Sequence, residues 1–456
     1  MTISKIQAGI FTLAVLACTL ATVSSFGDSQ VRIVRLSDVE GGVQIHRNAN
    51  PPEKAFLNLP IVQGNQVRTL GDGRAEIEFE DGGTLRMAPD TAVDFSQLSL
   101  DDSGTMVSKV DIGAGVTYVD FKNTKNARLT LTFGREKVIL TRAVHLRVEV
   151  LEKNAAVAVL SGEADVETPS GTVQVSKNRT AVFDLAGNEL GKIAKNVEPG
   201  PYDAWDKQQE RYQQRNGNSV IAGSSPYSYG LADLSYYGAY SNIPGYGLMW
   251  QPYFVGAGWD PFMDGAWAFY PGMGYGWVSA YPWGWTPYHS GSWSFIPGHG
   301  WAWRPGRSWT ALNTSPAVVN APASFVAPRA PAIAGQSLVM VNRGPSSTFA
   351  GHSTSKLIIQ NNSAGLGIPR GEVNNLAKIS ERANTRGAVT ARIHAAPVQT
   401  APMSGAGSQT SSGLGSRGMS SSSSPYPAQR GGGPSMHSAG PAVQHSAPGG
   451  RGPSKN

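Results

Sequence analysis

The sequence predicts an all-β protein: an antiparallel β-sandwich or roll, followed by a small region of aromatic β-hairpins and a disordered tail. Between Val31 and Leu185, short runs of alternating apolar and polar residues are separated by Gly, Asn, Asp or Pro. Many short strands at such spacing are typical of a sandwich, roll or barrel. Residues 223–310 are dense in Trp, Tyr, Gly and Pro, and residues 311–456 are rich in Ser, Gly, Pro and Ala. These changes in composition set the expected domain boundaries.

The clearest strand signal lies in residues 64–87, which read as strand, tight turn, strand, tight turn, strand. The small and apolar residues of its middle strand, which we expect to face the core, are Ala75, Ile77 and Phe79. The alternating charged residues, which we expect to face solvent, are Arg74, Glu76, Glu78 and Glu80. Glycine-rich turns at residues 71–73 and 81–83 flank this strand and supply residues that tolerate a positive φ.

Charge is divided unevenly along the chain. From residue 311 onward there are 12 Lys or Arg residues against two acids, Glu372 and Glu381, a net charge of +10. Because the whole chain carries +6, the first 310 residues carry about −4. The basic character therefore belongs to the tail, which suits anionic lipid, lipopolysaccharide or another acidic polymer. Export from the cytoplasm argues against nucleic acid as its partner.

Residues 1–25 resemble an export signal. A single Lys precedes an uncharged, mostly apolar run from Ile6 to Val23, and small polar residues follow. Cleavage is expected after Ser24 or Ser25, while an uncleaved membrane anchor is the alternative. The chain is therefore expected in the periplasm or cell envelope of a bacterium, with the membrane touched only through this segment.

The single cysteine, Cys18, follows Val15-Leu16-Ala17 within that apolar run. This sequence resembles a bacterial lipobox imperfectly, so Cys18 is a candidate lipidation site. The alternative is a small apolar residue of the signal. If the signal is removed, the mature protein has no cysteine and therefore no disulfide.

Several motifs in residues 31–190 occur in the order found in the FecR domain, which they resemble. The opening strand pair matches VEGGVQI at residues 39–45, and the central signature matches RAEIEFEDGGTLRM at residues 74–87. Later strands of that domain are similar to GVTYV at residues 115–119 and VAVLSGEADV at residues 157–166. The resemblance implies an extracytoplasmic β module.

FecR domains are best known from sensors that relay the occupancy of an outer-membrane receptor to a sigma factor. Such sensors carry a cytoplasmic anti-sigma segment before their membrane helix, whereas only about six residues precede the apolar run here. We therefore do not expect this chain to control a sigma factor directly.

Residues 199–217 predict a short linker helix that begins near Asp203. Trp205 and Tyr212 lie seven positions apart and share one face of this helix. Packing on the β domain is the expected role, because two apolar residues are too few for a coiled coil.

The aromatic region contains an internal repeat, in which residues 259–277 align with residues 285–303. The shared pattern predicts hairpins of aromatic strands joined by Pro-Gly turns, and resembles the YxWxP-like repeats that follow FecR domains in some bacterial envelope proteins. The candidate residues for binding a ligand or partner are Trp259, Trp267, Trp277, Trp285, Trp293, Trp301 and Trp303. Exposed rings would stack on sugars or a protein partner. The alternative is that the rings form the core of a domain poor in aliphatic residues.

Nothing in the sequence predicts catalysis, a cofactor or a metal site. The eight His residues form no ligand cluster at a recognised spacing, and no nucleophile motif occurs. The leading hypothesis is a non-enzymatic exported envelope protein with a FecR-like module for protein contact. The alternatives are a periplasmic sensor component of sigma/anti-sigma signalling and a binder of cell-wall glycan through the Trp repeats. The oligomeric state is not predicted.

Overall fold

The structure, a computed structural model, describes residues 32–47 and 51–398, apart from residues 123, 125, 188, 224, 226, 311, 313, 333–335 and 343–355. The expected export signal, the candidate lipidation site Cys18 and the tail from residue 399 lie outside the described residues. Within the described part of the chain, no helix is both long enough and apolar enough to cross a bilayer.

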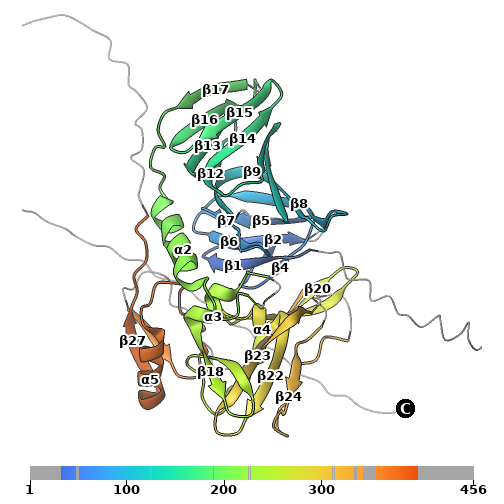
Figure 1. The fold of residues 1–456 in the computed structure, drawn as a ribbon, viewed down its shortest axis with the longest axis vertical. Helices are drawn as coiled ribbons and strands as arrows, with labels where there is room; N and C mark the ends of the chain where they lie inside the picture. The colour runs from blue at the N-terminus through green and yellow to red at the C-terminus, as the bar shows by residue number, and fades with distance from the viewer. Residues whose placement is uncertain are drawn as a thin grey trace, which may run out of the picture. The chain divides into compact units, whose positions relative to one another are not determined.

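Two sheets of a β-sandwich form the first part of the described chain (Figure 1). The first sheet has the spatial order β4 (Pro60–Ile61), β1 (Val34–Glu40), β6 (Arg74–Glu78), β7 (Thr84–Met87), β9 (Met106–Phe121), β12 (Val144–Val150), β13 (Asn154–Ser161), β16 (Arg179–Asp184) and β17 (Glu189–Ala194). The second has the order β3 (Glu53–Lys54), β2 (Val43–Arg47), β5 (Asn65–Thr69), β8 (Ala92–Leu100), β9, β10 (Ala127–Phe133), β11 (Glu136–Leu140), β14 (Glu163–Thr168) and β15 (Gly171–Ser176). The predicted all-β class is confirmed.

The long strand β9 belongs to both sheets. Its first half pairs with β8 up to Ala114, and its second half pairs with β12 from Gly115 onward. Gly115 has a φ of 93°, and a Cβ there would lie 2.4 Å from the Oγ1 atom of Thr91, so the crossing point requires glycine. Strand β10 then returns beside the first half of β9, which makes this pair parallel.

One of the two predicted tight turns is not a hairpin. Strand β5 pairs with β2 and β8, whereas β6 pairs with β1 and β7, so residues 70–73 carry the chain from one sheet to the other. The second turn, between β6 and β7, is a hairpin in which Gly82 has a φ of 82°. Alternation along the sequence predicts strands, but not which sheet each strand joins.

Helices and an aromatic module follow the sandwich. The helices are α2 (Asp203–Asn216), in the range where the sequence predicts one, α3 (Leu231–Tyr237) and α4 (Thr286–His289). A five-stranded sheet has the order β18 (Gly238–Ile243), β19 (Gly247–Pro252), β23 (Gly300–Trp309), β22 (Ser290–Ile296) and β24 (Ala317–Val319). A three-stranded sheet has the order β21 (Gly274–Ser279), β20 (Asp264–Tyr270) and β25 (Leu338–Asn342). We call residues 231–309 the aromatic module.

The aromatic module contains three copies of one hairpin, one more than the sequence comparison predicts. In the three copies Tyr240 pairs with Trp250, Trp267 with Trp277, and Trp293 with Trp303. Each turn reads Pro-Gly-x-Gly, with both glycines at positive φ. The first copy, residues 238–250, has Tyr in place of the first Trp and lacks the aromatic residue before the turn. The IPGYG run at residues 243–247 was the signal that could have found it.

The described part of the tail contains strands and a helix in stretches where the sequence allows them: SLVMVNRG and KLIIQNNS read as possible strands and residues 371–386 as a marginal helix, with disorder expected from about Thr400. Strand β24 pairs with β22 and β25 pairs with β20, so both complete sheets that begin elsewhere. Further on, β26 (Lys356–Gln360) pairs with β27 (Ala388–Arg392), and helix α5 spans Leu376–Arg386. The partners of β24 and β25 lie in the aromatic module, whereas β26 and β27 pair with each other.

A glycine two residues before the first ring of each hairpin allows the partner indole to pack against the backbone. At Gly265 a Cβ would lie 2.5 Å from the Trp277 ring and 2.6 Å from the carbonyl oxygen of Val278. We expect Gly265→Ala to lower the free energy of unfolding by about 1–3 kcal/mol through overpacking. Urea unfolding followed by Trp fluorescence measures the change. Gly258→Ala is the matched control, because a Cβ there meets nothing within 4 Å. Equal effects of the two variants would contradict this account.

Candidate functional site

The charged face of strand β6 is buried, which corrects the prediction that it faces solvent. The exposed fractions of Glu76 and Glu78 on β6, and of Glu80 two residues beyond its end, are 0%, 2% and 4%. On the other face, Ala75, Ile77 and Phe79 lie in the sandwich core, as predicted. Strand β6 is therefore buried on both sides, and the carboxylates on its outer face need cationic partners.

Neighbouring segments of the same sheet supply the first of these partners. On β1, Arg35 lies directly across from Glu78, and its Nη1 atom is 3.1 Å from the Glu78 carboxylate. On β7, Arg86 lies directly across from Glu76, at 2.7 Å. Arg32, just before β1, pairs with Glu80 at 2.6 Å. Each Glu thus meets an Arg from a flanking segment.

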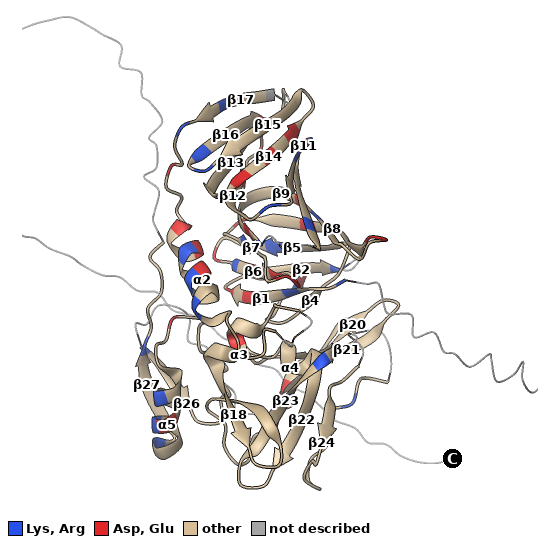
Figure 2. Cartoon of the chain, in the orientation of Figure 1, with Lys and Arg blue, Asp and Glu red and all other residues tan. Residues whose placement is uncertain are grey.

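Carboxylates on the two following helices complete the neutralisation. Asp206 of α2 lies 2.8 Å from Arg86, and Asp233 of α3 lies 2.6 Å from Arg35. No Lys or Arg occurs between Gly217 and Trp303, as the sparse colouring of this region shows (Figure 2). Asp233 therefore depends on cations from other parts of the chain.

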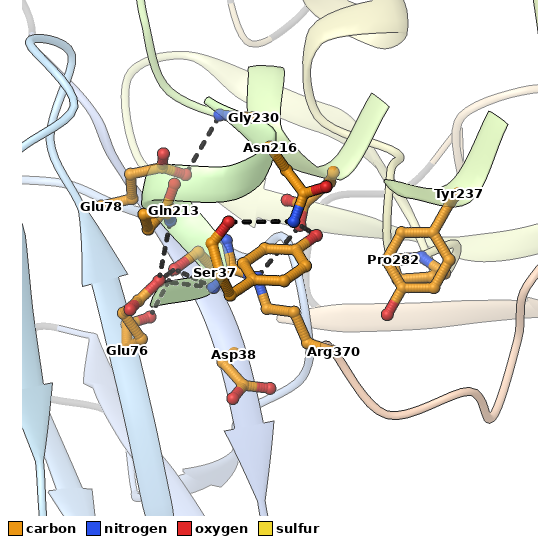
Figure 3. Close-up of polar contacts among 12 residues, drawn as sticks. Ser37, Asp38, Glu76, Glu78, Gln213, Asn216, Gly230, Tyr237, Pro282 and Arg370 are labelled. Carbon is orange, nitrogen blue, oxygen red and sulfur yellow. Dashed lines mark hydrogen bonds and ion pairs between the residues drawn. The ribbon is translucent and has the colours of Figure 1, made fainter. Parts of the chain in front are cut away.

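Arg370 closes this network from the far end of the described chain (Figure 3). Its Nη1 atom forms an ion pair with Glu76, and its Nε atom donates to Asp233 at 3.0 Å. Its guanidinium also lies over the Tyr212 ring, 4.6 Å from the centroid. We call the set Arg35, Glu76, Glu78, Arg86, Asp206, Asp233 and Arg370 the charged junction.

The pKa values of the two central carboxyl groups of the charged junction are shifted in opposite directions. Burial raises the pKa of Glu76, but Arg370 and Arg86 outweigh it and lower the pKa to about 2. Burial also raises the pKa of Glu78, and Arg35 and Arg370 oppose it only in part, so the pKa lies at about 7. At neutral pH Glu76 is therefore ionised, whereas Glu78 is partly protonated.

A histidine borders the charged junction on strand β12. The Nε2 atom of His145 lies 3.0 Å from the Asp206 carboxylate. Burial lowers the pKa of His145, but Asp206 raises it by more, so the pKa is higher than usual. The contact between α2 and the first sheet is therefore strongest when His145 carries its proton.

Uncharged contacts join the sandwich to the aromatic module beside the junction. Asn58 donates its amide to the carbonyl oxygens of Ser279 at 3.0 Å and Tyr281 at 2.7 Å. Arg35 donates to the carbonyl oxygen of Pro282 at 3.0 Å. Tyr270 of β20 donates to the carbonyl oxygen of Pro60 at 2.9 Å. Hydrogen bonds from side chains to backbone carbonyl oxygens thus join the aromatic module to the sandwich.

The candidate binding tryptophans all lie in the interior. The buried set is Trp259, Trp267, Trp277, Trp285, Trp293, Trp301 and Trp303. Three of them use the indole N–H internally: Trp259 donates to the Tyr281 hydroxyl at 2.9 Å, Trp293 to the Pro287 carbonyl at 3.1 Å and Trp303 to the Ser290 carbonyl at 2.8 Å. Their rings contact one another edge to face and contribute packing. None of the seven presents an exposed face for stacking on a sugar.

Among the described residues, no three His, Cys, Asp or Glu side chains lie together as a metal site would require. His289 is buried beside Trp285 and Trp309, and its burial lowers its pKa to about 3. His299 lies at an exposed hairpin turn. The charged junction can hold helices against a sheet, and the strength of its ion pairs depends on pH.

Two family models match this chain, one on each module. Residues 65–165 match the FecR protein family, and residues 231–325 match a family of unknown function, DUF6600. The chain therefore contains a FecR domain, as its motifs predict, followed by a second domain that includes the Trp-rich hairpins. The FecR match supports a role related to signalling and to contact with a protein partner, without naming that partner.

No curated protein matches the sequence. Among solved structures, two crystal structures of a protein from Parabacteroides distasonis ATCC 8503, proposed to be an anti-sigma factor, are similar to it, at 1.65 Å and 2.50 Å resolution. Each is 13% identical, with a TM-score of 0.27 over 31% of this chain and 63% of that chain. This likeness is too low to support an argument about function.

The signal for half of the charged junction was present in the sequence. Once β1, β6 and β7 are recognised as neighbours, cross-strand pairing brings Arg35 and Arg86 to the glutamates of β6. Asp206, Asp233 and Arg370 had no such signal, because tertiary packing alone brings them to this sheet.

Removing Arg370 tests the junction. We expect Arg370→Met to lower the free energy of unfolding by about 3–5 kcal/mol, because Glu76 and Asp233 stay buried with one cation fewer. Chemical denaturation measures the loss, and hydrogen exchange should show faster opening of α3. Arg382→Met, on the exposed side of α5, is the matched control. A loss no larger than that of the control would contradict the role given to Arg370.

Glu78 gives the stability of the protein a pH dependence. Its folded pKa of about 7 lies above the ordinary value of 4.5, so the folded state binds the proton more tightly. The stabilisation that results is present at low pH and is lost as the pH rises from 4.5 to about 7. We expect Glu78→Gln to remove this part of the pH dependence, as measured by urea unfolding at a series of pH values. Parallel curves for wild type and variant would exclude Glu78 as the source.

Proposed function

We propose that this chain is a non-enzymatic, exported protein of the bacterial cell envelope with a role in signalling. In this proposal the FecR domain makes the protein contact, and the aromatic module is a rigid body attached to it. The FecR match at residues 65–165 carries the proposal. The apolar run from Ile6 to Val23 supports export, since it has the composition of a signal segment.

The burial of the carboxylates of the charged junction supports a non-catalytic role for them. A general acid or base must reach a substrate, and it is commonly found in a pocket or cleft. Here Glu76, Glu78 and Asp233 are buried against arginines of the same chain and have internal partners. The shifted pKa values of Glu76 and Glu78 follow from this packing.

The same junction supports mechanical coupling between the two modules. Arg35 contacts Glu78 of the sandwich, Asp233 of α3 and the backbone at Pro282. A partner that binds either module therefore acts on both, because buried ion pairs join the sandwich to the aromatic module. The expected partner is another envelope protein. Cell-wall glycan is the weaker alternative, because the tryptophans on which it depended are buried.

Deleting the gene and comparing transcripts tests the proposal. We expect a small, defined set of transcripts to change, and wild-type protein supplied in trans to restore them. A version that lacks residues 1–25 should accumulate in the cytoplasm and fail to restore them. Unchanged transcripts would refute the signalling role, and rescue by the cytoplasmic version would refute the need for export.

A further inference from the structure

The sandwich has four outer edges, and three of them carry features that prevent further strand pairing. Strands β3 and β4 have two residues each, and β4 contains Pro60. Strand β17 carries Lys192 and pairs with β16 through a register shift between Val182 and Phe183. Short length, proline, charge and bulges are the usual means by which proteins block edge strands.

The fourth edge, β15, has none of these features. It pairs with β14 over its whole length, from Thr168 opposite Gly171 to Glu163 opposite Ser176, without a register shift. Its sequence, GTVQVS, contains no proline and no charged residue, and its ribbon is accordingly tan throughout (Figure 2). In the described part of the chain, no backbone bond joins its residues to a strand other than β14. One side of β15 therefore presents unpaired N–H and C=O groups.

The side chains of β15 are chemically symmetric about its fourth residue. Gln174 lies at the centre, with Val173 and Val175 on either side and Thr172 and Ser176 beyond them. The two valines lie opposite Val166 and Ala164, on the core side of the sheet. The three polar residues are exposed on the other side.

We propose that β15 pairs with β15 of a second copy of this chain, antiparallel and centred on Gln174. A two-fold axis perpendicular to the sheet keeps the core sides aligned, so Val173 of each copy meets Val175 of the other. Thr172 then meets Ser176, and the two Gln174 side chains face each other. The sheet that ends at β15 continues across the axis into the second copy.

Charge favours a second copy over a charged peptide as the occupant of this edge. No pair within the six residues brings like charges together. The nearest acidic row, Glu163, Asp165 and Glu167, lies on β14. In the dimer the two β14 strands are three strand spacings apart, about 14 Å, so salt screens their repulsion. Because the pairing is short, the dimer should be weak and reversible.

Sedimentation of the purified full-length protein, from about 10 μM to about 1 mM, tests this proposal. We expect a reversible monomer–dimer equilibrium. Gln174→Glu and Gln174→Lys should each weaken association about tenfold or more, because they place like charges about 5 Å apart on the axis. An equal mixture of the two variants should restore association, because Glu then faces Lys. Position 174 is exposed but lies directly opposite Asp165, so Gln174→Glu should lower the unfolding midpoint slightly and Gln174→Lys should raise it slightly, whereas both should weaken association.

Ser96→Glu is the matched control, since it adds a charge at an exposed position of the interior strand β8 in the same sheet. It should leave association unchanged. A wild-type chain that stays monomeric to the highest concentration would overturn the proposal and leave the edge for a different protein. A dimer that tolerates both charges, or one that the mixture fails to restore, would also overturn it.

Discussion

Burial of the carboxylates on the outer face of β6 is the constraint on which the arrangement of this protein depends. An unpaired buried charge costs several kcal/mol, so each glutamate requires a cation within the same interior. Arg35 and Arg86 satisfy this requirement from β1 and β7. Asp206 pairs with Arg86 and Asp233 pairs with Arg35. Arg370 is a second cation beside Asp233. Ion pairing thus positions two helices and a distant loop against one strand.

The aromatic module depends on the charged junction to neutralise Asp233, which is fully buried near the first sheet. Asp233 lies in a stretch without Lys or Arg, so Arg35 and Arg370 must supply its counter-charge. The module in turn uses large rings where most domains use aliphatic side chains. Its hairpins place indoles over glycine backbone and donate indole N–H groups to internal oxygens. The aromatic module therefore needs the sandwich, which supplies part of the counter-charge of Asp233.

This construction bears on where a FecR domain of this kind can meet other proteins. Helices α2 and α3 and the segment around Arg370 cover the outer face of β6, so that face is committed within the chain. The second sheet and the sandwich edges other than β4, whose Pro60 contacts the aromatic module, remain for intermolecular contact. Among those edges, β15 is the one without charge, proline or bulge. Coupling through the charged junction means that contacts made there act on a body that includes the aromatic module.

The sequence by itself determined the all-β class, the strands of residues 64–87, the helix at α2 and the aromatic hairpins, because alternation and turn residues act locally. It identified Ala75 and Ile77 as core, but it placed Glu76 and Glu78 in solvent, since a polar face is normally a wet face. Only the tertiary structure decided that helices cover this face and that Arg370, from the basic tail, neutralises it. Those partners lie far apart in sequence, and their pairing is stable only after the sheet has brought the charges together.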